Sequence, residues 1–364
     1  RSAISSIISQ YVGANQLEEV KDLPAQATGV ILLGSLFILG ISYPFAKEIF
    51  KFYNASGLVL DLSIDYFKIR IFGFPFSLFV FAIFGTFRGL QNTFYPMLIA
   101  IIGALLNVVL DLLFVYGIEG YFPAIHIKGP AYASVISQVS MSGIAFYFLR
   151  NKTPISLKIT LPFNKEIKRL LGMIANLFVR TIALNIALYF GTSYATSYGK
   201  EYIAAYTIGL NIWFLGAFMI DGYSSAGNIL SGKLLGAKEY KTLLKLSNKL
   251  IKYGIANGLL LAIVGFIFYT PIGEIFTKEP LVLEQFYKVF WIILAMQPIC
   301  AVTFIFDGMF KGMGEMKTLR NLLIISTGVV FIPILLAFNA FDYKLYAIWI
   351  AFSAWIFVRG FPLI

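Results

Sequence analysis

Long apolar runs alternate with short polar breaks along the whole 364-residue chain. The breaks contain charged residues, glycine or proline, and several runs reach the ~20 residues that a helix needs to cross the hydrocarbon core of a bilayer. Residues 1–14 are expected to be the end of one membrane-spanning helix. Ten further spans are predicted, at residues 26–50, 62–87, 94–117, 129–149, 168–192, 202–234, 250–272, 284–310, 319–339 and 343–363.

The composition excludes a soluble fold, because 59% of the residues are hydrophobic and only 13% are charged. A net charge of +11 would suggest nucleic acid as a partner of a soluble protein. Here the basic residues lie mostly in the breaks, as the positive-inside rule requires of cytoplasmic loops. We therefore expect a multi-pass protein of the cell (inner) membrane, with membrane lipids and no nucleic acid as partners.

Two segments of the chain repeat one another. Phe87-Arg88-Gly89 ends one apolar run, and Phe310-Lys311-Gly312 ends another, 223 positions later. Pro75 and Pro298 have the same separation, as do Gly13-Ala14 and Gly236-Ala237. Both basic segments fall on the predicted cytoplasmic side, so the sequence predicts a parallel repeat of the kind found in transporters.

The repeat predicts an all-α membrane protein made of two six-helix bundles. We expect an N-terminal lobe at residues 1–150, a cytoplasmic linker at 151–167 and a C-terminal lobe at 168–364. The second half begins its first span near Lys168, and the equivalent point of the first half would precede residue 1. The full protein is therefore expected to have twelve spans, of which the first and most of the second are absent from this sequence.

Ionisable residues within spans are costly and indicate a functional site. Asn107 and Asp111 are four residues apart and lie on one helix face, where they could hold a proton or a cation such as Na⁺. A purely structural role in joining helices is the alternative. The second half has its own candidate charges at Arg180, Asp221 and Asp307, and an ion pair between Arg180 and Asp221 would cancel two of them.

The catalytic alternatives are weak. His126 is the only histidine and lies in a polar break, and Cys300 is the only cysteine and lies in an apolar run. No histidine or cysteine cluster is therefore available for a metal site or for acid–base catalysis within the membrane. We expect no enzyme activity and no cofactor, apart from H⁺ or Na⁺ as a coupling ion.

Several motifs resemble the multidrug and toxic compound extrusion (MATE) family over essentially the whole chain. In the first half these are Gly13-Ala14, residues 87–93, residues 106–111 and residues 129–134. In the second half, Arg180-Thr181, Ala204-Ala205 and Ile220-Asp221-Gly222 are most similar to the DinF branch.

The resemblance implies a V-shaped cavity between two lobes and export of cationic or amphipathic organic compounds, driven by inward flow of H⁺ or Na⁺. It also implies a coupling site in which Asn107 and Asp111 match the pair on the fifth helix. Ser134 stands where the family has a threonine. Asn176 and Arg180 occupy the helix in which the NorM branch carries a glutamate, which favours a coupling site confined to the first lobe.

The resemblance leaves a second function open, a flippase for lipid-linked oligosaccharides or cell-wall precursors from the same superfamily. Several arginines lining a cavity would favour the flippase, and from the sequence only Arg180 is well placed. An intramembrane enzyme is the remote alternative. The expected partner is a small organic substrate, and the expected state is a monomer.

Overall fold

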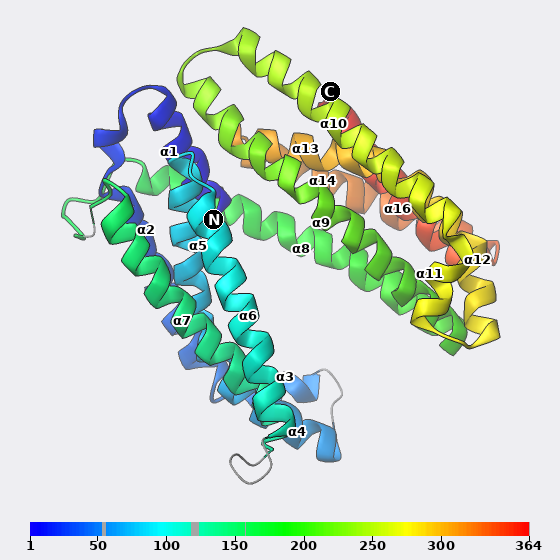
Figure 1. The fold of residues 1–364 in the computed structure, drawn as a ribbon. Coiled ribbons are helices and arrows are strands. Elements are labelled where there is room, and N and C mark those ends of the chain that lie inside the picture. The colour runs from blue at the N-terminus through cyan, green and yellow to red at the C-terminus, as the bar shows by residue number, and fades with distance from the viewer. Residues whose placement is uncertain (53–55, 118–123, 157, 364) are drawn as a thin grey trace. The chain divides into compact units, whose positions relative to one another are not determined.

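A computed structural model describes residues 1–52, 56–117, 124–156 and 158–363 (Figure 1). In these ranges every regular element is a helix, so the predicted all-α class is confirmed. The chain forms two compact units, Arg1–Leu170 and Leu171–Ile364.

Unit 1 contains seven α-helices and a short 3₁₀ turn among the described residues. The elements are α1 (Ser2–Gly13), η1 (Leu17–Val20), α2 (Leu23–Ser42), α3 (Ala46–Phe52), α4 (Gly57–Arg70), α5 (Gly73–Gly89), α6 (Phe94–Tyr116) and α7 (Lys128–Lys152). Helix α5 packs against α1, α2 and α7, and α6 packs along α7.

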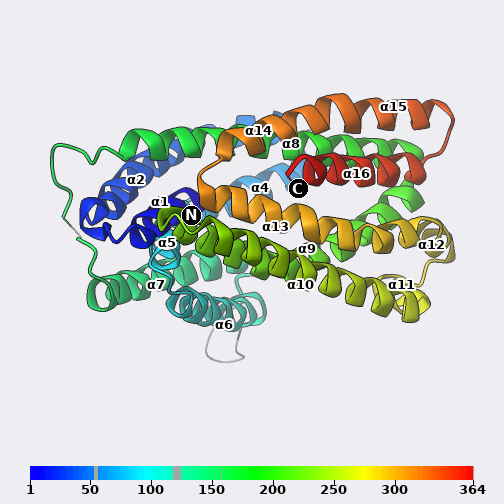
Figure 2. The same ribbon diagram turned by 90° about the horizontal axis from the view of Figure 1, so that it is seen from above.

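Unit 2 begins within α8 (Ile167–Tyr198). Its other elements are α9 (Lys200–Gly236), α10 (Tyr240–Ile267), α11 (Tyr269–Phe276), α12 (Pro280–Ala295), α13 (Gln297–Met313), α14 (Met316–Ile325), the π-helix η2 (Ser326–Phe331), α15 (Ile332–Ala340), α16 (Leu345–Gly360) and η3 (Phe361–Leu363). Helix α13 lies between α10 and α16 and packs most extensively against α9 (Figure 2).

The ten predicted spans all correspond to helices in the described chain. Eight helices are long and apolar enough to cross a membrane, and two bent helix pairs raise the number to ten. The bends are 46° between α4 and α5 and 49° between α12 and α13. Pro298 follows the second bend directly, as expected where a proline ring prevents a helix from continuing.

The span predicted at residues 26–50 is wrong at its C-terminal end. The helix ends at Ser42, and α3 begins as a separate helix at Ala46. Pro44 lies in the turn between them. A proline in the interior would remove a backbone donor and clash with the preceding turn, so the helix ends before it.

The internal repeat is visible in the backbone of both units. The two bends lie at equivalent positions of the repeat, and so do two left-handed turns. Asn15 and Lys238 both have φ 58°, and Gln91 (φ 65°) matches Gly314 (φ 92°). Each of these residues follows the end of a helix, where a left-handed residue turns the chain away from the helix axis.

Equivalent glycines of the repeat lie at close contacts between helices in both units. A Cβ atom added at Gly85 would lie 3.2 Å from the Cα atom of Arg1, which precedes the neighbouring α1. At the equivalent place in unit 2, a Cβ atom added at Gly308 would lie 2.7 Å from the carbonyl carbon of Ser224 on α9. Small residues allow membrane helices to pack at such close range.

The core of unit 2 is rich in aromatic side chains. Trp349, Phe352 and Trp355 of α16 are fully buried, together with Phe331 of the π-helix. Trp213 of α9 contacts this group edge to face with Trp349, at 6.5 Å between ring centroids. The Trp349 ring packs directly against Gly209, since a Cβ atom added at Gly209 would lie 2.7 Å from the Cζ2 atom of that ring.

Candidate functional site

The predicted coupling residues lie on the α6–α7 pair of unit 1. Gly103 of α6 lies against Met141 of α7, and Phe114 of α6 lies against Gly129 of α7. These two contacts set the register of the antiparallel pair. By that register Ser134 is level with residues 109–110, between Asn107 and Asp111.

Asn107 and Asp111 also lie on the same face of α6. At 3.6 residues per turn, residues 103, 107, 111 and 114 lie within about 80° of one another around the α6 axis. Gly103 and Phe114 make the contacts with α7, so Asn107 and Asp111 are on the side of α6 turned towards α7. All three predicted residues are partly buried. Asn107 and Asp111 therefore lie together, at the level of Ser134 on the neighbouring helix.

Two polar atoms of this site have no hydrogen-bond partner among the residues that the structure describes. They are Nδ2 of Asn107 and Oδ1 of Asp111, and both are buried. An unsatisfied polar group costs more in a membrane than in water, because no solvent replaces the missing bond. A proton or a small cation at the carboxylate would satisfy the oxygen, which is the chemistry that an ion-coupled site needs.

Arg70 lies near this helix pair and was not assigned a site role from the sequence. Its guanidinium donates a hydrogen bond of 3.0 Å to Oε1 of Gln138, one turn along α7 from Ser134. Arg70 also lines a cavity of about 440 Å³ together with Ser42, Phe67 and Ser77. An arginine within an apolar run was the only sequence signal for it, and its partner could not be read from the sequence.

In unit 2, the structure pairs Arg180 with a different carboxylate from the one expected. The sequence suggested Asp221, whereas the Arg180 guanidinium contacts the carboxylate of Asp307. Lys311 Nζ lies 3.3 Å and an Arg359 nitrogen 3.6 Å from the same oxygen, Oδ2 of Asp307. Arg180 and Asp307 are 127 residues apart in the sequence, so the sequence pattern could not indicate that they meet. Asp221 is exposed on unit 2.

Helices α8 and α9 each carry a stripe of polar and aromatic side chains on an exposed face. On α9 the stripe consists of Thr207, Asn211, Phe214, Phe218 and Asp221. The spacing of three and four residues places these side chains on one face of the helix. On α8 the corresponding stripe consists of Thr181, Asn185, Tyr189, Thr192 and Thr196. Amide, hydroxyl and carboxylate groups exposed on spanning helices favour faces that line a water-filled path rather than lipid.

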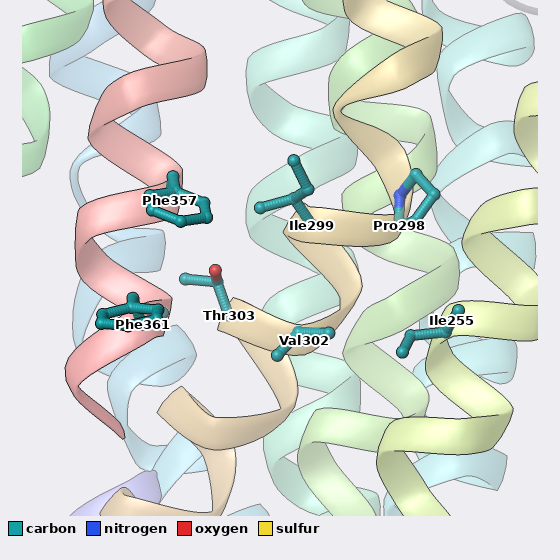
Figure 3. Close-up of a pocket in the computed structure, with 8 residues that line it drawn as sticks. Ile255, Pro298, Ile299, Val302, Thr303, Phe357 and Phe361 are labelled. Atoms are coloured by element: carbon teal, nitrogen blue, oxygen red, sulfur yellow. The ribbon is translucent and has the colours of Figure 1, made fainter. Parts of the chain in front are cut away.

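A separate apolar groove lies within unit 2 between α10, α13 and α16. It has a volume of about 250 Å³. Figure 3 shows Phe357 and Phe361 on one side and Ile299 and Thr303 of α13 on the other. The hydroxyl of Thr303 donates to the backbone oxygen of Ile356, at 3.1 Å. Within the described part of the chain the residues that line this groove are apolar apart from Thr303, so it can accept an apolar group.

The fold and these sites define a polytopic membrane protein of the transporter type. It has two helical units that share an internal repeat, with polar groups inside the spans. Among the described residues there is no group of three or more histidine, cysteine, aspartate or glutamate side chains that could hold a metal ion. The MatE family model matches residues 1–113 and 177–336, which is more than half of the chain. The chain belongs to the MATE family, whose members are transporters and not enzymes.

Individual relatives agree with this assignment. Protein DETOXIFICATION 42 of Arabidopsis thaliana is 24% identical over 329 residues, covering 85% of this chain. The chain spans 61% of that relative's length and between 52% and 56% of three further DETOXIFICATION proteins. DNA damage-inducible protein F of Escherichia coli is 21% identical over 370 residues, covering 100% of this chain and 78% of the relative.

The fold is shared with solved structures. A mutant form of the Vibrio cholerae MATE transporter VcmN superimposes with a TM-score of 0.91 at 18% identity. The match covers 100% of this chain and 82% of the VcmN chain. The helical fold of the chain is therefore that of MATE transporters.

Proposed function

We propose that this protein is a secondary active antiporter of the inner membrane that exports cationic or amphipathic organic compounds in exchange for H⁺ or Na⁺. The observation that carries the proposal is the unpaired carboxylate oxygen of Asp111, buried on a spanning helix beside Asn107. A buried carboxylate without a donor is ready to take up a proton or a cation.

Coupling requires the ion to bind two conformations of the transporter with different affinity. In the conformation described by the structure, Oδ1 of Asp111 accepts no hydrogen bond from any described residue. Ion binding there would stabilise this arrangement of α6 and α7 over one that exposes Asp111 to water, where its carboxylate would be solvated. Alternation between two such arrangements would drive substrate outward as the ion moves inward.

The stripe on α9 suits the proposed substrates. It places the carboxylate of Asp221 on the same helix face as the exposed rings of Phe214 and Phe218. Aromatic faces attract organic cations, and a carboxylate at the end of the stripe adds a charge of opposite sign. Thr207 and Asn211 continue the stripe with polar groups that can remain in contact with water.

The test uses the complete protein reconstituted in proteoliposomes. Efflux of ethidium is followed under an imposed H⁺ or Na⁺ gradient for wild type, Asp111→Asn and Asp61→Asn. Asp61 lies on the exposed surface of α4, so it provides the same chemical change away from the site. We expect Asp111→Asn to abolish gradient-driven efflux and Asp61→Asn to retain it.

Equal loss of efflux in both variants would refute a coupling role for Asp111. The gradient that drives wild-type efflux identifies the ion. Wild-type protein that moves no organic cation under either gradient would refute the export proposal itself. Ser134→Ala removes only a hydroxyl at the level of the Asn107–Asp111 pair, and we expect it to weaken efflux without abolishing it.

A further inference from the structure

Three basic side chains surround one carboxylate inside unit 2. Arg180 of α8, Asp307 of α13 and Arg359 of α16 are 8%, 7% and 5% exposed, and Lys311 follows Asp307 by one turn. We call these four residues the basic cluster. With three positive charges and one negative charge, the basic cluster has a formal excess of two positive charges.

The carboxylate cannot satisfy all three basic groups. Arg180, Lys311 and Arg359 all approach the same atom, Oδ2 of Asp307. The Nε atom of Arg180 is buried and has no hydrogen-bond partner within the described part of the chain. An unpaired positive group is costly in a membrane, where charged side chains pair with one another or face a solvated path.

The three basic residues are not equivalent. The guanidinium of Arg359 lies 4.5 Å from the ring centroid of Trp355 and 5.9 Å from that of Phe304. These cation–π contacts help to hold Arg359 in place beside Asp307. Arg180 keeps an unused donor, and the Lys311 side chain is 21% exposed. Arg180 and Lys311 are therefore the groups with capacity for a further partner.

The fold does not require a charge at this place. Phe84 stands at the repeat position of Asp307 in unit 1 and is 6% exposed there. An apolar side chain thus fills the equivalent position of the same architecture. The charged network therefore belongs to unit 2 and is not a requirement of the architecture that the two units share.

We propose that the basic cluster binds the anionic group, a carboxylate or a phosphate, of an amphipathic ligand. Arg180 and Lys311 donate to this group, and Arg359 with Asp307 holds the cluster in place. Guanidinium and ammonium groups form strong charge-assisted hydrogen bonds to both kinds of oxyanion. This proposal depends on the proposed export function in one respect: it takes the bound ligand to be the transported substrate.

Binding is measured without an ion gradient, so its failure is distinct from a failure of export. The complete protein in detergent is titrated with benzoate and with inorganic phosphate by isothermal calorimetry. We expect Arg180→Gln and Lys311→Gln each to weaken binding at least about tenfold. We expect Asp307→Asn to strengthen it, because the competing carboxylate is removed. Lys252→Gln, at an exposed position of α10, is the matched control and should bind as wild type does.

Folding is checked by size-exclusion chromatography, and Arg180→Lys provides a variant that keeps the charge but loses the Nε donor. It should bind with an affinity between those of wild type and Arg180→Gln. Wild-type protein that binds neither anion would overturn the proposal. Equal affinities of Arg180→Gln and Lys252→Gln would overturn it too, as would Asp307→Asn binding no more tightly than wild type.

The anionic group could belong to a free solute or to a lipid headgroup. Phosphate titrations are therefore repeated in nanodiscs of phosphatidylcholine, with and without phosphatidylglycerol. A lipid headgroup in the basic cluster competes with phosphate, so phosphatidylglycerol would then lower the apparent phosphate affinity of wild type and of Lys252→Gln alike. Phosphate binding that phosphatidylglycerol leaves unchanged supports a soluble anionic ligand.

Discussion

The close approach of α9 and α13 leads to a quantitative prediction at Gly308. A Cβ atom added there would overlap the backbone oxygen of Ser224 and would lie 2.7 Å from its carbonyl carbon. The obstacle is backbone, which cannot rotate away as the end of a side chain can. The two helices must therefore separate to accept even a methyl group.

Overpacking of this kind costs about 1–3 kcal/mol. For a unit of this size, each kcal/mol corresponds to a change of about 2–4 °C in the melting temperature. We therefore expect Gly308→Ala to lower the melting temperature of the complete protein in detergent by about 2–12 °C. The melting temperature is followed by circular dichroism.

Gly222 on α9 is the matched control, because a Cβ atom added there meets nothing within 4 Å. Alanine is the better helix former by about 1 kcal/mol, so Gly222→Ala should leave the melting temperature unchanged or raise it slightly. If Gly308→Ala is as stable as Gly222→Ala, the close contact between α9 and α13 is not present in the protein and the reasoning fails.

Three further predictions concern charged and polar groups. Asp307→Leu leaves the buried Arg180 and Arg359 without their carboxylate and should cost about 3–5 kcal/mol. The cost is measured as a fall in melting temperature that a second change, Arg359→Leu, partly reverses. Asn164→Ala removes hydrogen bonds to the backbone of Glu19 and to Asp22, and should speed proteolytic cleavage within residues 151–167; cleavage at the wild-type rate would contradict this. The hydrogen bond and charge of Glu19 raise the pKa of Lys165. The pair therefore stabilises the fold fully at a pH below the ordinary pKa of lysine, and this stabilisation is lost as the pH rises through the raised pKa of Lys165. Glu19→Gln should lower the pKa of Lys165, as followed by NMR of ¹³C-methylated lysines, and an unchanged titration would show that the pair does not form in solution.

The hydrogen bonds of residues 151–167 show what local sequence does not reveal. The backbone of Asn164 donates to Oε1 of Gln26 at 2.8 Å, and the backbone of Ser156 donates to the oxygen of Lys21. These bonds join segments more than 130 residues apart. A run of polar residues predicts a connection between helices, but the surface on which that connection lies depends on the packed unit.

The amino-acid sequence alone was enough to predict the helical class, the spans and the repeat. An apolar run long enough to cross the membrane is expected to form a helix, because a helix satisfies all of its backbone hydrogen bonds within the segment itself. The duplicated Phe-basic-Gly segments and the matched prolines predicted two related units, and both bends occur at equivalent positions. The proximity of Asn107 to Asp111 was also readable, because four residues make about one turn of a helix.

Which distant groups meet depended on the packing of the helices. An ion pair between Arg180 and Asp221 was one hypothesis for two isolated charges in neighbouring spans, and Arg180 pairs with Asp307 instead. Arg359 and Trp355 gave no sequence signal as members of that cluster. The periodicity of the sequence shows which residues share one face of a helix. Which other helix that face contacts is decided by the packing of the helices. The packing in turn depends on small residues such as Gly308, which permit close approach.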